Sequence, residues 1–261
     1  MMITSQPVLF ALGGALLFGV AGWLVSLARR DVSIVDSMWS LMFVISALGY
    51  ASQAEELGPR TSLVLAMLVI WALRLSLYIG WRNWGEEEDY RYQQIRKNNS
   101  PNFPLKSLYI VFGLQAVLAW FVSLPVLAAI SGSAPLGLLD GLGVALWLTG
   151  FFFESVGDFQ LARFRANPEN QGKVMRTGLW RFTRHPNYFG DFCVWWGFYL
   201  VAASSGAWLT IISPLLMSFL LLKVSGVAML EKTIATRRPK YADYIASTNA
   251  FFPGPSRSKD Q

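Results

Sequence analysis

The sequence contains very little of the chemistry that builds metal centres or disulfides. Its 261 residues include one cysteine, Cys193, and one histidine, His185. A single cysteine cannot close an intrachain disulfide, and a single histidine excludes a multi-histidine metal site, so we expect no bound metal. Charged residues are also scarce, at 15% of the chain. The chain therefore has less polar surface than a soluble domain of this size needs.

Apolar side chains dominate what is present. Hydrophobic residues make up 54% of the chain, which has 11 tryptophans and a mean hydropathy of +0.40. This composition predicts a multi-pass integral membrane protein in contact with membrane lipids. The net charge of +6 does not indicate nucleic-acid binding, because the basic residues lie in loops beside apolar runs.

Seven segments are long enough, or nearly so, to cross about 30 Å of hydrocarbon as helices. They cover residues 7–28, 33–52, 61–81, 107–130, 136–157, 189–205 and 208–229. The first has no signal-peptide cleavage site and is expected to stay as a span. The pattern predicts an all-α fold, a single membrane domain over residues 1–261 with seven transmembrane helices.

The basic residues predict the orientation. All but three of the 22 lysines and arginines follow odd-numbered spans; the exceptions are Arg60, Arg74 and Lys223. Because cytoplasmic loops are enriched in Lys and Arg, we expect the N-terminus outside and the C-terminus in the cytoplasm.

The stretch GLWRFTRHPNYFGDFCVWWG, from Gly178 to Gly197, places many polar groups at the start of an apolar segment. These are Arg181, Arg184, His185, Asn187, Tyr188 and Asp191. Pro186 favours a helix start, whose free amide groups and positive end would hold an anion. The alternative is that the arginines mark the cytoplasmic side of a span and the aromatic residues form an interfacial belt.

Polar residues also occur in and beside the second and third predicted spans. Asp36 lies near the mouth of the second span, where an ionisable group is a functional candidate, although a helix-start carboxylate is the plain alternative. Trp71, Arg74 and Tyr78 share one stripe of the third span. We expect Arg74 to pair with Asp36, either as a substrate site or as a structural ion pair.

The run GEEEDYRY, residues 85–92, is densely polar. It is either a solvated loop or a lid in which Glu88, Asp89, Arg91 and Tyr92 fold back over a ligand.

Further along the chain, Glu154, Asp158 and Arg165 share one helical face, and the Asn167-Pro168 pair is expected to end that helix. With Lys173 and Arg184 these residues could frame a ribose and phosphates; ordinary intrahelical pairing is the alternative. In the C-terminal tail, Glu231, Tyr241 and Tyr244 suggest a cap over a cofactor, whereas lipid-surface anchoring explains only the arginines.

The stretch Gly178–Gly197 resembles the C-terminal signature of steroid 5-alpha-reductase-like membrane reductases, especially their bacterial branch. Its core, RHPNYFG, is also similar to the cofactor-binding segment of isoprenylcysteine carboxyl methyltransferases. The likeness extends from about Glu154 to Pro253 and, less closely, to the DxxW motif at Asp36 and the EDxRY motif at Glu88.

The resemblance to the bacterial branch implies a seven-helix enzyme of a bacterial inner membrane, with NADPH held on the cytoplasmic side by residues 136–253. A lipid-like enone would enter from the bilayer among the helices of residues 1–130. Carried over by position, the implied cofactor ligands are Asp158, Arg165, Lys173, Arg184, His185, Asn187, Tyr188 and Asp191.

The implied catalytic set is Asp36, Trp71, Arg74, Tyr78 and Tyr92. Asp36 falls near the glutamate that meets the ketone in the steroid enzymes. Trp71 stands where those enzymes carry a tyrosine, so Tyr78 or Tyr92 is the candidate to supply the missing phenol.

Three functions are compatible with these residues. The first is NADPH-dependent reduction of a conjugated carbon–carbon double bond in a lipid-like, 3-oxo-steroid-like enone, with hydride going to the β-carbon and membrane-embedded acids polarising the carbonyl. The second is methyl transfer from S-adenosylmethionine to a lipid or prenylated acceptor. The third is a non-enzymatic membrane protein, such as a transporter or assembly factor. The cationic residues favour the phosphate-rich NADPH.

Overall fold

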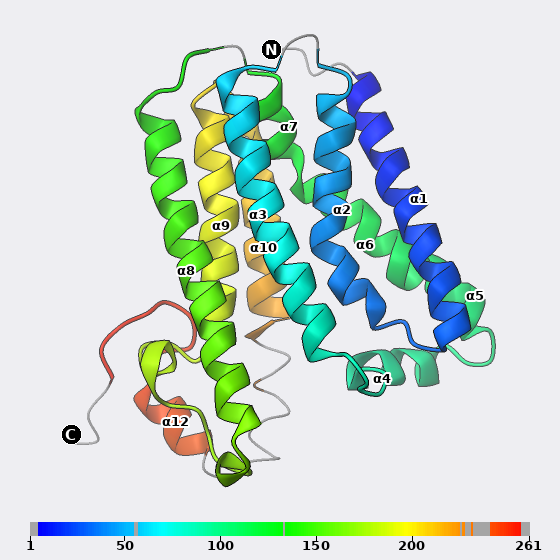
Figure 1. Cartoon of the computed structure of the whole chain (residues 1–261), viewed down its shortest axis with the longest axis vertical. Helices are drawn as coiled ribbons and strands as arrows, with labels where there is room; N and C mark the ends of the chain where they lie inside the picture. The colour runs from blue at the N-terminus through cyan, green and yellow to red at the C-terminus, as the bar shows by residue number, and fades with distance from the viewer. Residues whose placement is uncertain are drawn as a thin grey trace. The chain divides into compact units, whose positions relative to one another are not determined.

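A computed structural model describes residues 5–54, 57–132, 134–224, 226–227, 231 and 241–256. Every regular element within these residues is helical, as the sequence predicts. The chain divides into two compact units, which are described separately (Figure 1). The first unit comprises Met1–Gly137 and Val201–Thr210, and the second comprises Leu138–Leu200 and Ile211–Gln261. The basic residues of the tail between 232 and 240 and beyond 256 lie outside the described residues.

In the first unit, α2 lies between α1 and α3 (Figure 1). The bounds are Ser5–Arg29 for α1, Ile34–Ala51 for α2 and Pro59–Arg82 for α3. The side chains of Phe43 and Trp71 are fully buried between α2 and α3 and meet edge to face. Large apolar side chains on these helices, such as Leu17, Leu48 and Leu77, are exposed, as expected for surfaces that contact lipid.

The fourth predicted span, residues 107–130, is not one helix. The chain forms α5 (Phe103–Ser107), a π-helical turn (Leu108–Gly113), α6 (Leu114–Val122) and then, after a break, α7 (Leu124–Ile130). Pro125 explains the break, because in a continuous helix its ring would clash with a carbonyl of the preceding turn. Ser123 at the break bonds with the Tyr50 hydroxyl at 2.8 Å and donates to the Trp120 carbonyl.

Arg60, the basic residue predicted on the non-cytoplasmic side, is buried. Its guanidinium donates to the carbonyls of Ala134 and Pro135 at 2.8 and 2.9 Å, and to the Ser204 hydroxyl at 3.2 Å. This arginine therefore joins the start of α3 to two loops of the same unit. The chain turns at residues 204–206, between the sixth and seventh predicted spans.

The second unit is built on the long helix α8 (Leu138–Ala166), α9 (Pro186–Ala203), α10 (Ile212–Phe219) and the short α12 (Tyr241–Ser247), with the last turn of α9 counted in the first unit. A π-helical turn, Leu220–Val224, continues α10. The predicted helix start at Pro186 and the predicted helix end before Pro168 are both confirmed. The Trp196 indole donates to the Ser218 hydroxyl and joins α9 to α10.

Glycines let α8 and α9 approach each other closely. A Cβ atom at Gly190 would lie 2.4 Å from the Glu154 amide nitrogen and 2.5 Å from the Gly150 carbonyl oxygen. One at Gly197 would lie 2.7 Å from the Gly143 carbonyl oxygen. These contacts are with backbone, which cannot move aside as a flexible side chain can. Small residues at a helix–helix contact are the usual device for close packing in membrane proteins.

Five of the described helical segments are long and apolar enough to span a membrane, which supports a multi-pass membrane protein. They are Gln6–Arg29, Ile34–Ala51, Pro59–Arg82, Phe103–Val122 and Leu138–Ala166. The sixth predicted span corresponds to α9, and the seventh to the shorter apolar stretch Trp208–Val224, with its remaining residues mostly outside the described part. Seven spans and the orientation of the termini stay predictions.

Candidate functional site

Among the described residues, we single out one cluster of polar side chains in each unit. The Asp36 cluster in the first unit comprises Asp36, Asp89, Arg91, Tyr92 and Gln115. The Arg184 cluster in the second unit comprises Thr183, Arg184, His185, Glu231 and Tyr244.

Asp36 lies in the first turn of α2, and both of its carboxylate oxygens are bonded by the segment that follows α3. The Arg91 guanidinium donates to Oδ2 at 2.5 Å, and the Tyr92 hydroxyl donates to Oδ1 at 2.6 Å. The Gln115 side-chain amide, from α6, in turn donates to the Tyr92 hydroxyl at 3.1 Å. Of the two phenols predicted to accompany Asp36, Tyr92 is therefore the one described in contact with it.

Burial and charge keep Tyr92 protonated. Its side chain is buried, and desolvation together with the neighbouring Asp36 carboxylate raises the pKa of the phenol well above its usual value, although Arg91 and Gln115 act in the opposite direction. At neutral pH Tyr92 is thus a hydrogen-bond donor held against a carboxylate.

The polar run at residues 85–92 is docked to the turn between α1 and α2. The Asp89 amide donates to the Ser33 hydroxyl at 2.7 Å, and the Val32 amide donates to Glu88 Oε1 at 3.0 Å. Arg96, on α4 (Tyr90–Asn98), pairs with the same Glu88 carboxylate at 2.7 Å. Of the two interpretations from the sequence, a simple solvated loop does not fit these contacts, whereas closure over a ligand stays a prediction.

Two acidic groups of this docked run, Glu88 and Asp89, have lowered pKa values. Partial burial raises the pKa of Glu88, but the Arg96 guanidinium and the Val32 amide outweigh it, so the net pKa is below its usual value. The pKa of Asp89 is lowered in the same way by Arg91, against desolvation. Asp89 also caps α4, because its carboxylate accepts from the Arg91 amide.

The predicted stripe on α3 is only partly polar. Trp71 is completely buried beside Phe43 and belongs to the apolar core. The Arg74 guanidinium lies over the Tyr78 ring, 5.5 Å from its centroid, as their spacing predicts. The ion pair expected between Arg74 and Asp36 stays a prediction, since the described partners of Asp36 are Arg91 and Tyr92.

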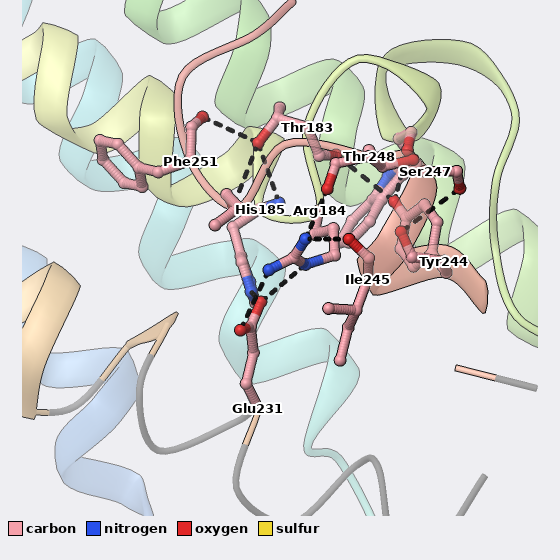
Figure 2. Close-up of polar contacts among 11 residues, drawn as sticks. Thr183, Arg184, His185, Glu231, Tyr244, Ile245, Ser247, Thr248 and Phe251 are labelled. Carbon is pink, nitrogen blue, oxygen red and sulfur yellow. Dashed lines mark hydrogen bonds and ion pairs between the residues drawn. The ribbon is translucent and has the colours of Figure 1, made fainter. Parts of the chain in front are cut away.

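Arg184 is the centre of the second cluster (Figure 2). Its Nε and Nη2 donate to the two carboxylate oxygens of Glu231, at 2.8 and 3.1 Å, and its Nη1 donates to the carbonyls of Ile245 and Thr248. The side chain is buried. Arg184 therefore holds Glu231 and the end of α12 against the start of α9, and its nitrogens are engaged within the protein.

Glu231 is also in contact with His185, whose Nε2 lies 3.2 Å from Oε1. Partial burial raises the pKa of Glu231, but the hydrogen bonds and charges of His185 and Arg184 outweigh it and lower the pKa to about 2. His185 stacks on Tyr188 with ring centroids 5.7 Å apart. The sequence analysis placed Glu231 in a cap over the cofactor segment, and the structure brings it to that segment.

The two tail tyrosines pack against the same region. The Tyr244 hydroxyl donates to the Trp180 carbonyl, and its ring meets Tyr241 edge to face. Burial raises the pKa of Tyr241 to about 12 and raises that of Tyr244 further, so both phenols are neutral at physiological pH. The Thr183 hydroxyl donates to the Phe251 carbonyl at 2.8 Å (Figure 2), which ties down the segment after α12.

The first turn of α9 differs from the open anion site that the sequence suggests. The Phe189 amide donates to the His185 carbonyl, and the Tyr188 amide donates to Asn187 Oδ1. The Asn187 side-chain amide donates to Asp158 of α8 at 3.1 Å. A neighbouring carboxylate therefore lies at this helix end, where the sequence analysis expected a bound anion.

The remaining predicted cofactor residues fall into two environments. Glu154 and Asp158 are buried on α8 and Asp191 is half-buried on α9, whereas Arg165 and Lys173 are exposed. Of the three residues predicted to share one face of α8, Glu154 and Asp158 therefore lie in its packed part and Arg165 lies at its exposed end.

Sequence analysis did not single out Gln115. Its signal is a lone polar amide within an otherwise apolar run, and such amides commonly bond across helices in membranes.

The fold and the two clusters define a helical multi-pass membrane protein with ionised groups gathered at the ends of its helices. A family model described as "Protein of unknown function (DUF1295)" matches residues 22–248, and the chain belongs to this family, which includes steroid 5-alpha-reductase-like proteins. "Uncharacterized protein C594.04c" of Schizosaccharomyces pombe is 25% identical over 291 residues, covering 95% of this chain and 80% of the yeast protein. No solved structure matches the chain.

Proposed function

We propose that the protein is a membrane-embedded, NADPH-dependent reductase that saturates a conjugated carbon–carbon double bond in a lipid-like enone. The observation that supports it best is the contact between Tyr92 and Asp36, which places a buried, neutral phenol against a carboxylate at the end of a membrane helix. Enone reduction collects negative charge on the carbonyl oxygen, and a preorganised donor in a water-poor site stabilises that charge.

In this proposal NADPH supplies a hydride to the β-carbon, solvent supplies a proton to the α-carbon, and the products are NADP⁺ and the saturated ketone. The carbonyl oxygen binds on the side of Tyr92 on which Asp36 lies, and the Tyr92 hydroxyl donates its hydrogen bond to that oxygen in place of Asp36. Asp36 and Arg91, which are paired at 2.5 Å, hold the phenol in place.

The second unit fits a phosphate-rich dinucleotide in two respects. Its Arg165 and Lys173 are exposed cationic side chains, and the stacked pair of His185 and Tyr188 offers a flat ring face. Arg184 fits less directly, because Glu231 already occupies its donors. We therefore assign Arg184 to the support of this region, and Arg165, Lys173, His185 and Tyr188 to contact with the cofactor.

The engagement of Arg184 by Glu231 favours a second candidate, an S-adenosylmethionine-dependent methyltransferase acting on a lipid or prenylated acceptor. Because Glu231 engages Arg184, one of the cations that favoured a ligand with several phosphates is already neutralised within the protein. Glu231 is in addition a carboxylate that could accept from the ammonium group of S-adenosylmethionine.

The test uses purified protein in liposomes with cholestenone as a lipid-like enone and NADPH deuterated at the transferred position. The reductase assignment predicts a saturated ketone that carries one deuterium at the β-carbon. Transfer of a methyl group from S-adenosylmethionine to a prenylated acceptor, with no consumption of NADPH, would instead support the second candidate.

A further inference from the structure

A π-helical turn, Leu108–Gly113, directly precedes α6. Such a turn inserts one extra residue into a helix. The side chains of the helix beyond the turn are therefore rotated about the helix axis by about 100° relative to an unbroken α-helix. Gly113 accommodates it, because a Cβ atom there would lie only 3.1 Å from the Leu108 carbonyl oxygen. π-helical turns are rare and occur frequently at functional sites.

The first polar side chain after this turn is Gln115, two residues beyond Gly113. Its Nε2 donates to the Tyr92 hydroxyl at 3.1 Å, and the Tyr92 hydroxyl donates to Asp36 Oδ1 at 2.6 Å. Rotated back by one residue, Gln115 would face about a quarter of a turn away from Tyr92. The π-helical turn thus accounts for the direction in which Gln115 points.

The direction of these two bonds matters chemically. A phenol has one proton to donate, and a hydrogen bond that its oxygen accepts fixes where that proton points. With Gln115 donating from one side, the Tyr92 proton is directed to the side of Asp36. An apolar residue at position 115 would leave the hydroxyl free to rotate about its C–O bond.

We propose that Gln115 is a positioning residue that orients the Tyr92 hydroxyl, and that the π-helical turn Leu108–Gly113 places it there. This inference rests on the proposed reductase function, in which Tyr92 donates to the carbonyl oxygen. Gln115 acts through Tyr92 and contacts no reacting atom. The charged groups that face this pair are Asp36 from α2 and Arg91 from α4.

Three variants separate positioning from a merely structural role. Gln115→Met keeps the length of the side chain and removes the donor. Gln115→Glu keeps a donor only while its carboxyl is protonated. Gln93→Met is the matched control. The side-chain amide of Gln93, on α4, is also a hydrogen-bond donor, but it donates to the Glu88 carbonyl and not to Tyr92.

With cholestenone and NADPH, we expect Gln115→Met to lower kcat roughly tenfold, the rate equivalent of one hydrogen bond, with the KM for NADPH unchanged. Gln115→Glu should recover activity at acidic pH and lose it as its carboxyl ionises, since a carboxylate accepts the Tyr92 proton instead of donating. Adding Gln115→Met to Tyr92→Phe should cause no further loss. The inference would be overturned if Gln115→Glu had the same low kcat as Gln115→Met at every pH. It would also be overturned if the losses in kcat from Gln115→Met and Tyr92→Phe added up in the double variant.

A measurement without substrate keeps this inference separate from the reductase proposal. Fluorotyrosine placed at position 92 gives a fluorine NMR resonance that reports the bonding of its hydroxyl. We expect Gln115→Met to shift this resonance and Gln93→Met to leave it unchanged. An unshifted resonance in Gln115→Met overturns the positioning role, whether or not cholestenone is reduced. A shifted resonance in a protein that does not reduce cholestenone would support the geometry and count against the reductase function alone.

Discussion

At the scale of single residues, the two carboxylates that matter most are held by partners far away in the sequence. Asp36 is bonded by Arg91 and Tyr92, and Glu231 by Arg184 and His185. Each residue of these pairs carries a sequence signal of its own, as a charged or polar group beside an apolar run. The pairing does not, because separations of about 50 residues leave no periodic pattern that links the partners.

Tyr92→Phe and Asp36→Asn test the first pair. The proposal predicts that each variant lowers turnover of cholestenone by about tenfold or more, because the donor to the developing enolate is lost or disordered. Binding of NADPH should be unchanged in both. Turnover numbers equal to those of the wild type would remove Tyr92 and Asp36 from the catalytic set.

Glu231→Gln tests the second pair through its pH dependence. The pKa of Glu231 is depressed to about 2 from a usual 4.5, so its contribution to stability is present above pH 4.5 and is lost as the pH falls towards 2. We expect Glu231→Gln to cost roughly 1.5–3 kcal/mol at pH 7, measured by thermal unfolding in detergent. The variant should then lose less stability than the wild type on going from pH 4.5 to pH 3.

Glu87→Gln is the control for this measurement, because Glu87 is exposed in the loop before α4. Its melting curve should follow that of the wild type at each pH. Identical pH profiles for the wild type and Glu231→Gln would show that the bond between Arg184 and Glu231 contributes no stability.

At the scale of elements, the contact between α8 and α9 sets the position of the Arg184 cluster. Their glycines recur at intervals of seven, at Gly143, Gly150 and Gly157 on α8 and at Gly190 and Gly197 on α9. This repeat is visible in the sequence, but it does not show which helix is the partner. By contrast, Pro186 and the Asn167-Pro168 pair act locally, and both helix boundaries that they predict are confirmed.

Gly190→Ala is expected to destabilise this contact. Its new methyl group would meet two backbone atoms of α8 at 2.4 and 2.5 Å, and overpacking of this kind costs about 1–3 kcal/mol. Gly141→Ala on the same helix pair is the control, because nothing lies within 4 Å of a Cβ there. In detergent, the melting temperature should fall for the first variant and hold or rise slightly for the second. A fall of similar size in both would argue against the close approach of α8 and α9.

The docked run before α4 is the other element whose role could not be predicted. Its composition is that of a solvated loop, and only the contacts of Glu88 and Asp89 with the turn before α2 show that it is held down. The break at Ser123 was also missed, although Pro125 gives it a local cause.

At the scale of the whole molecule, the class of protein followed from composition alone, since apolar runs of the right length have few alternatives to membrane helices. The five candidate spans overlap five of the seven predicted ones, although the fourth is Phe103–Val122 rather than residues 107–130. At the sixth predicted span stands α9, which is as long as α2 but carries Asn187 and Asp191 in its first turns. At the seventh stands the shorter apolar stretch Trp208–Val224, which contains Lys223.

Reporter fusions in bacterial cells test the complete topology. We expect alkaline phosphatase fused to the N-terminus to be active outside the cytoplasm, and green fluorescent protein fused to the C-terminus to fluoresce inside it. The physical reason is the concentration of Lys and Arg after odd-numbered spans. An inactive N-terminal alkaline phosphatase together with a fluorescent C-terminal fusion would require an even number of spans and would contradict the predicted seven.

The most direct test of the central claim is a thermal-shift titration of the full-length protein with NADPH and, separately, with S-adenosylmethionine. A ligand that binds the native state raises the melting temperature with its concentration. The account predicts a saturable rise with NADPH that is reduced in a double variant, Arg165→Ala with Lys173→Ala, and no rise with S-adenosylmethionine. A rise with S-adenosylmethionine and none with NADPH would contradict it.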